Sequence, residues 1–102
     1  MRRLRFLVEF PFPAAADRVR IWKSIFPTQA KIASLDYDFL GRLEITGGNI
    51  SNIALNAAFR ASSEGSPITM QHVLAATRQE YDKIDKMILQ SEFGRYYAAV
   101  RP

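Results

Sequence analysis

The stretch that decides the fold is TGGNISNIALNAAFRA, residues 46–61. Apolar residues recur in it every three or four positions, which is the spacing of one buried face of a helix. That face consists of Ile50, Ile53, Ala54, Ala57, Ala58 and Ala61. Its four alanines are small and let another helix approach closely. The pattern predicts a helix over residues 50–63, with a turn at residues 45–49 before it and Gly65 closing it.

On the C-terminal side, Thr69 is a suitable cap for another helical pattern. The predicted buried stripe of this helix consists of Met70, Val73, Leu74, Thr77, Tyr81, Ile84 and Ile88. His72, the only histidine, has polar neighbours, so we expect it on the surface. The apolar residues that follow Gln90 predict a short helix packed back against the rest of the chain.

Two shorter helices are predicted on the N-terminal side. Asp36 can cap a helix over residues 36–44. The buried residues of that helix are expected to be Phe39, Leu40 and Leu43. Another helix, over residues 14–26, has Trp22 on its apolar face. Pro27 ends it, because proline disfavours a helical residue before it.

Residues 4–12 have the pattern of a strand, since every second side chain is apolar. That apolar set is Leu4, Phe6, Val8 and Phe10. Pro11 and Pro13 prevent regular pairing and end the strand. One strand cannot satisfy the hydrogen-bonding groups at its own edges, so we expect its neighbours to lie outside this chain. The residues alone therefore predict a mainly α fold, in which one N-terminal β-strand precedes a bundle of four helices.

The composition limits the classes of function. Apolar residues make up 48% of the 102 residues, which is enough for one buried core. No stretch is long enough to span a membrane, and the absence of cysteine fits a reducing cytoplasm. The net charge is +4, but the basic residues are scattered apart from those at the N-terminus. This distribution favours a solvated surface over a nucleic-acid partner.

Three segments, in this order, resemble the C-terminal part of AAA+ ATPases. They are RRLRFLVEFPFP (residues 2–13), similar to the arginine-rich motif and last core strand of the family; TGGNISNIALNAA (residues 46–58), similar to the sensor-2 turn and helix; and PITMQHVLAA (residues 67–76), similar to the last helix of the lid. The resemblance covers about residues 2–85, and the order and spacing of the segments make it specific.

The resemblance implies a division of the chain into two parts. Residues 1–13 would be the end of an AAA+ core domain, and residues 14–102 would be its helical lid. Asp17 and Arg18 match the residues with which the first lid helix opens. Ala14 departs from the family pattern, because an acidic residue often stands there, and this helix would lack its usual cap.

By the same resemblance, Gly47 and Gly48 would contact ATP. The sensor-2 turn contains no arginine here, which implies contacts to the base and ribose through the backbone. A glycine pair lets the backbone approach a ligand, and a helix N-terminus offers free amide donors. The alternative interpretation is a flexible turn capped by Asn49. Ile21 and Ile25, one helical turn apart, correspond to lid residues that touch adenine, and their alternative role is core packing.

Arg2 and Arg3 correspond to a possible arginine finger that acts in the active site of a neighbouring subunit. Their alternative role is to keep a basic strand end soluble. The phosphate-binding loop Gly-x-x-x-x-Gly-Lys-Ser/Thr is absent from the chain, so this chain alone is expected not to hydrolyse ATP. The resemblance implies two partners, the missing AAA+ core domain with its Mg²⁺ and further copies in a hexameric ring. No metal site of the chain's own is expected.

Two other classes of function remain open at this point. One is a helical protein- or nucleic-acid-binding module without enzymatic activity, and the other is a structural subunit whose strand joins a partner's sheet. A DNA-binding module predicts a basic stripe on one recognition helix. Residues 50–63 contain only Arg60 as a cation, which does not favour that interpretation.

Overall fold

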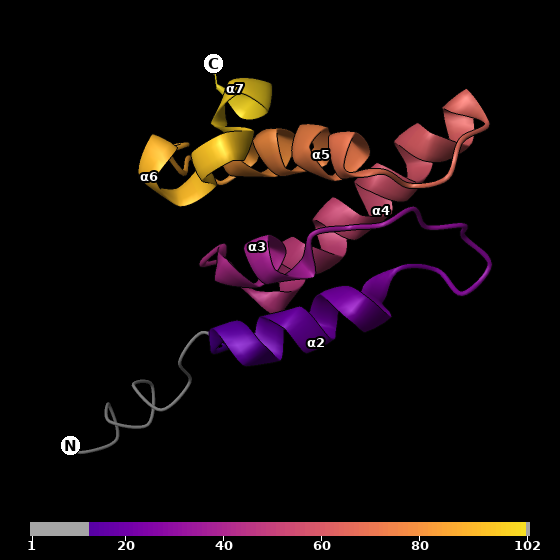
Figure 1. The fold of residues 1–102 in the computed structure, drawn as a ribbon, viewed down its shortest axis with the longest axis horizontal. Coiled ribbons are helices and arrows are strands. Elements are labelled where there is room, and N and C mark those ends of the chain that lie inside the picture. The colour runs from indigo at the N-terminus through magenta and orange to yellow at the C-terminus, as the bar shows by residue number, and fades with distance from the viewer. Residues whose placement is uncertain (1–12, 102) are drawn as a thin grey trace.

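The deciding stretch forms α4 (Gly47–Glu64) in the computed structural model, which describes residues 13–101 (Figure 1). This helix begins at Gly47 and not at the predicted Ile50, because Thr46 and Asn49 form a capping box. The Thr46 hydroxyl accepts the Asn49 N–H at 3.1 Å, and the Asn49 side chain accepts the Thr46 N–H at 3.0 Å. The predicted turn therefore ends at Thr46, and the glycine pair is helical. Gly65, at φ +65°, ends the helix as predicted.

Next along the chain is α5 (Met70–Lys83), which packs against α4 and is capped by Thr69 as predicted. Most of the predicted stripe is buried, but the helix ends at Lys83, and Ile84 is 38% exposed. Ile88 is half-buried and packs against the core, but the helix predicted to carry it ends earlier for a local reason. Asp85 has a left-handed backbone at φ +59°, which turns the chain out of the helix.

Two helices, α2 (Ala15–Ile25) and α3 (Tyr37–Arg42), pack against each other on the other side of α4 from α5 (Figure 1). Both are slightly shorter than predicted, and Ala14 provides no side-chain cap for α2, as expected. Trp22 is fully buried, and its indole N–H donates to the Leu40 carbonyl at 3.1 Å. This bond joins the two helices in the core.

Backbone pairing joins the connection after α2 to the connection before α5. The Ala33 N–H donates to the Ile68 carbonyl at 2.8 Å, and the Ile68 N–H donates to the Lys31 carbonyl at 2.9 Å. Ile68 is buried in the core. Two segments far apart in the sequence are therefore held together by main-chain bonds.

The C-terminal segment comprises α6 (Gln90–Phe93), the 3-10 helix η1 (Gly94–Tyr96) and α7 (Tyr97–Val100). Phe93 is 1% exposed, and its ring lies 5.7 Å from that of Phe39 and 5.5 Å from that of Tyr81, between ring centroids. The Tyr96 ring also packs against Phe39, with ring centroids 4.5 Å apart and the ring planes tilted by 51°. The predicted packing of this segment against the rest of the chain is confirmed.

The described part of the chain is mainly helical, as the sequence predicts. The strand predicted at residues 4–12 lies outside the described residues. Of the predicted core-domain part, residues 1–13, the structure describes Pro13 alone. Within residues 13–101, no helix has the length and apolar character needed to cross a membrane.

Candidate functional site

The first turn of α4 presents two backbone amides that donate to no acceptor within residues 13–101. Gly47 and Gly48 are its first helical residues, where an α-helix has no internal acceptor for its N–H groups. Asn49 and Ile50 donate to the Thr46 hydroxyl and carbonyl. Neither glycine N–H donates to any residue in the part of the chain that the structure describes. Among the described residues, these two amides are left without an acceptor, as the first N–H groups of a helix commonly are.

Ile21 lies beside this turn. A Cβ built on Gly47 would stand 4.0 Å from the Ile21 Cδ1 atom, so α2 brings an apolar side chain up to the first residue of α4. Ile25 is half-buried one turn farther along α2 and packs on the core, as Ile21 also does. Gly48 is exposed, and the nearest atom to a Cβ there would be Thr46 Oγ1 at 3.7 Å. The structure thus brings together Ile21 and Gly47.

A buried carboxylate holds the same turn from the side of α5. Glu80 is 5% exposed, and its Oε2 atom accepts the side-chain amides of Asn49 at 3.0 Å and Asn52 at 3.2 Å. Glu80 was not among the residues that the sequence pattern predicted to belong to a site. Glu80 follows Val73 by seven residues, a spacing that places it on the buried face of the helix. Because glutamate is rarely buried, the residue type predicts an exposed position instead.

Arg18, within α2, is a second buried charged residue, at 6% exposure. Its Nε atom donates to the Gly41 carbonyl at 2.7 Å, and its guanidinium also donates to the Pro13 carbonyl. The residue that resembles the opening of a lid helix therefore ties α2 to α3 and to the chain that enters α2.

His72 is buried, at 8% exposure, and the prediction of a surface position is wrong. Its Nδ1 atom accepts the Thr69 N–H at 3.0 Å, and its Nε2 atom lies 2.8 Å from Glu64 Oε1. Polar neighbours in sequence did not predict this, because the histidine stands at the third position of α5 and folds back over the cap. Within residues 13–101, no three His, Asp or Glu side chains gather where they could hold a metal ion.

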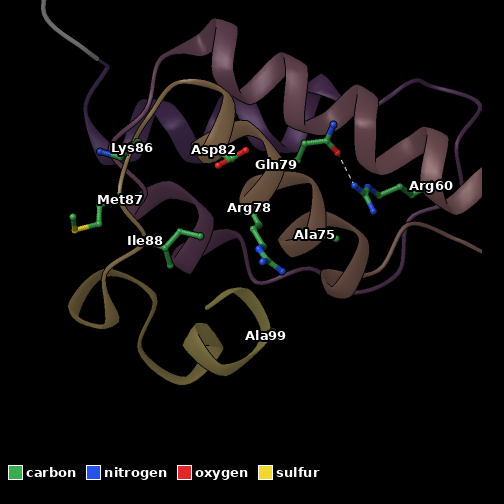
Figure 2. Close-up of a pocket in the computed structure, with 9 residues that line it drawn as sticks. All are labelled: Arg60, Ala75, Arg78, Gln79, Asp82, Lys86, Met87, Ile88 and Ala99. Atoms are coloured by element: carbon green, nitrogen blue, oxygen red, sulfur yellow. Dashed lines mark hydrogen bonds between the residues drawn. The ribbon is translucent and has the colours of Figure 1, made fainter. Parts of the chain in front are cut away.

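A separate groove of about 570 Å³ lies between α4, α5 and the C-terminal segment (Figure 2). Three of its lining residues are cations, Arg60, Arg78 and Lys86, and one is an acid, Asp82. Arg60 is held by Gln79, whose side-chain oxygen accepts its guanidinium at 2.7 Å. None of the residues predicted to contact a nucleotide lines this groove.

Two pKa shifts belong to the docking of the C-terminal segment. The pKa of Asp36 is lowered, because its carboxylate accepts the Phe39 N–H, the Tyr96 hydroxyl and the Arg95 guanidinium. Burial, together with the negative charge of Glu92, raises the pKa of Tyr81. The Tyr81 hydroxyl donates to Glu92 at 3.0 Å. Both groups stabilise the fold and lie outside the first turn of α4.

The predicted finger residues Arg2 and Arg3 lie outside the described residues. The chain matches no protein-family model, no curated protein and no solved structure. The candidate site therefore consists of the two glycine amides that no described residue accepts, the apolar side chain beside them and the buried carboxylate that holds their turn.

Proposed function

We propose that this chain is the C-terminal lid of an AAA+ remodelling ATPase, in which the start of α4 contacts the adenine and ribose of ATP. In this proposal α2 to α5 are the four helices of the lid bundle, and residues 4–12 are the last strand of the core domain. The observation that carries the proposal is the approach of Ile21 to Gly47, beside two amide donors that no residue of the described range accepts. A nucleoside has the complementary features, an apolar ring face and polar edge atoms.

Gly48 supports the same proposal, because the fold does not require a glycine there. Its φ is not positive, and an added Cβ would make only an ordinary contact with Thr46. Glycine within a helix costs about 0.5–1 kcal/mol relative to alanine. Close approach of another molecule to the backbone is a physical reason to keep glycine at this exposed position.

The proposed contacts bind and orient the nucleotide and supply no catalytic group. The triphosphate and Mg²⁺ would be held by the core domain, and ATP would supply the free energy that moves the lid. Arg2 or Arg3 would reach the site of the next subunit in a hexamer, in the cytoplasm. A lid that moves with nucleotide state would pass that change around the ring. Alone, the chain should bind ATP weakly and release no phosphate.

Nuclear magnetic resonance of the isotopically labelled chain tests the nucleotide contact. Titration with MgADP at millimolar concentration should shift the amide signals of Gly47 and Gly48 and the methyl signals of Ile21. Adenosine should shift the same signals, because the proposed contacts are to base and ribose. Pyrophosphate should leave them unchanged, since the phosphate contacts belong to the core domain. Gly94, in the C-terminal segment, is the internal control.

Three outcomes would count against the proposal. Adenosine that shifts none of these signals removes the base contact. Pyrophosphate that shifts them as ADP does makes the turn an anion site only. Micromolar ATP binding or phosphate release by the chain alone contradicts the division of labour between lid and core domain.

The second candidate function is a protein-binding module without enzymatic activity. The observation that favours it is the outer face of α4, where Leu55 is 67% exposed and Phe59 is 74% exposed, one helical turn apart. Two results together would favour this function. ADP would shift no signal, and the Leu55 and Phe59 signals would broaden as the chain is concentrated, which indicates association through this face of α4. For nucleic acid, the acid Asp82 among the cations of the groove is unfavourable.

A further inference from the structure

Glu80 is a charged side chain that α5 buries against the start of α4. A carboxylate removed from water costs free energy unless its oxygens are hydrogen-bonded. Here Oε2 accepts two amides of α4, from Asn49 and Asn52, and Oε1 lies 3.5 Å from the ammonium group of Lys83. Lys83 is 63% exposed, whereas the hydrogen bonds from the two α4 amides are partly buried.

Asn49 makes this contact part of the cap of α4. Its Oδ1 atom accepts the Thr46 N–H at 3.0 Å and the Thr46 hydroxyl at 2.9 Å, while its Nδ2 group donates to Glu80. Rotation of the amide would break all of these bonds at once. The backbone between Thr46 and Asn49 is the glycine pair, which loses more conformational freedom on ordering than any other residue type. The cap therefore needs a fixed anchor, and Glu80 supplies it.

We infer that Glu80 is a positioning residue, which aims the Gly47 and Gly48 amides through Asn49 and couples their occupancy to α5. This inference rests on the proposed nucleotide contact at the start of α4 and names the residue that transmits it. A ligand that draws the two amides towards it moves the first turn of α4. Because Asn49 and Asn52 donate to the same oxygen atom, that movement also acts on the last turn of α5. Such coupling is reciprocal, so α5 in turn sets the affinity of the turn for its ligand.

Amide hydrogen exchange of the full chain tests the positioning role. Glu80→Ala should speed exchange at Asn49 and Ile50 by about tenfold or more relative to Ala57, in the middle of α4. The matched control is Lys83→Gln, which removes the exposed partner of the other carboxylate oxygen and should leave this ratio unchanged. A purely structural role of Glu80 would speed all amides of α4 by one common factor. That uniform result would overturn the inference.

Titration with MgADP tests the coupling. In the wild-type chain ADP should shift the amide signals of Gly48 and also those of Glu80 and Tyr81. In Glu80→Gln the shift at Tyr81 should fall by roughly fivefold or more relative to the shift at Gly48. An undiminished response at Tyr81 would overturn the coupling.

The two arms separate this inference from the proposed function. If ADP shifts no signal in the wild-type chain, the proposed function and the coupling fail together, while the exchange ratio still decides whether Glu80 positions the turn. If Glu80→Ala does not fold, Asn52→Ala carries the exchange test. That variant removes one of the two donors and leaves the capping box intact. It should change the exchange ratio in the same direction by a smaller factor, and an unchanged ratio would count against Glu80.

Discussion

At the scale of single residues, glycine stands at different positions of this chain for different physical reasons. Gly65 has a left-handed backbone at φ +65°, which a side chain would strain, and it ends α4. Gly48 has no positive φ, and among residues 13–101 a Cβ added there would meet only Thr46 Oγ1, in an ordinary contact at 3.7 Å. The fold accounts for the first glycine and not for the second, which is why the function of the α4 turn can be tested by substitution at Gly48.

The proposed function predicts that Gly48→Val weakens nucleotide binding by the complete ATPase about tenfold or more, which is about 1.4 kcal/mol. The branched side chain would cover the amides of the first turn and block close approach of a ligand. The helical domain itself should stay folded, since among the described residues an added Cβ meets only Thr46 Oγ1 at 3.7 Å. The measurements are nucleotide affinity and ATP hydrolysis of the full-length variant, with thermal melting of the 102-residue chain.

The matched control for this substitution is Ser51→Val, at an exposed position one turn farther along α4. It introduces the same side chain without covering the glycine amides. Normal ATP hydrolysis in Gly48→Val would make the turn a helix cap only. Unfolding of the chain by Gly48→Val would show that this glycine serves the fold first.

Asp36 should make the fold sensitive to acid. Its pKa is lowered in the folded state, so it stabilises the fold at pH values above its unfolded pKa of about 3.9. This stabilisation is lost as the pH falls through the lower pKa of the folded state. Asp36→Asn should therefore be less stable than wild type in urea at about pH 7, and the difference should narrow at about pH 3. Asp38→Asn, at an exposed position, should have nearly the stability of the wild-type chain at both pH values.

At the scale of helices, the contact between α2 and α3 depends on the absence of a side chain at Gly41. A Cβ there would overlap Val19 and approach the Ala15 carbonyl oxygen at 3.1 Å. Because the Arg18 guanidinium also donates to the Gly41 carbonyl, the two helices meet at this residue through backbone and side chain together.

Gly41→Ala should destabilise the chain by about 1–3 kcal/mol, the usual cost of overpacking a tight core. The clash involves backbone of α2 as well as a side chain, so it cannot be relieved by rotation of Val19 alone. Gly48→Ala is the control, because the added methyl group has room there and alanine is the better helix former. Chemical denaturation measures both variants, and equal stabilities would contradict this packing.

At the scale of the whole molecule, the C-terminal segment completes the core. Phe93 fills the space between Phe39 of α3 and Tyr81 of α5, and Glu92 accepts the Tyr81 hydroxyl and the Glu44 N–H. Asp36 binds both Arg95 and Tyr96 of the segment. The last residues thus join helices from both halves of the chain (Figure 1).

Phe93→Ala should cost about 3–5 kcal/mol, as removal of a buried aromatic ring does. A loss of that size is a large part of the total stability of a small domain, about 5–15 kcal/mol. We therefore expect a strongly lowered melting temperature. Tyr81 should also become exposed to solvent at a lower temperature than in the wild-type chain, which tyrosine absorbance or fluorescence would measure. Met87→Ala, at a 73% exposed position, is the comparison. If both variants melt alike, the segment does not complete the core.

The sequence by itself determined the helical fold and most helix positions, because periodicity and caps are local. The small residues of α4, the caps at Asp36 and Thr69 and the closing Gly65 were all predicted correctly. The proximity of Ile21 and Gly47 was implied only through a family resemblance. The end of α5 was missed, because the left-handed Asp85 interrupts a stripe that continues in sequence.

Only the tertiary structure decided which polar residues are buried. Glu80, Arg18 and His72 are hidden, and each is held by a group from another element or by the residues of a cap. A polar side chain can be buried only when its partners are brought to it, and those partners are far away in sequence for Glu80 and Arg18. From residue type alone, such side chains are predicted to lie on the surface, where water satisfies their hydrogen-bonding groups. The link from Glu80 to the first turn of α4 could therefore be found only in the folded chain.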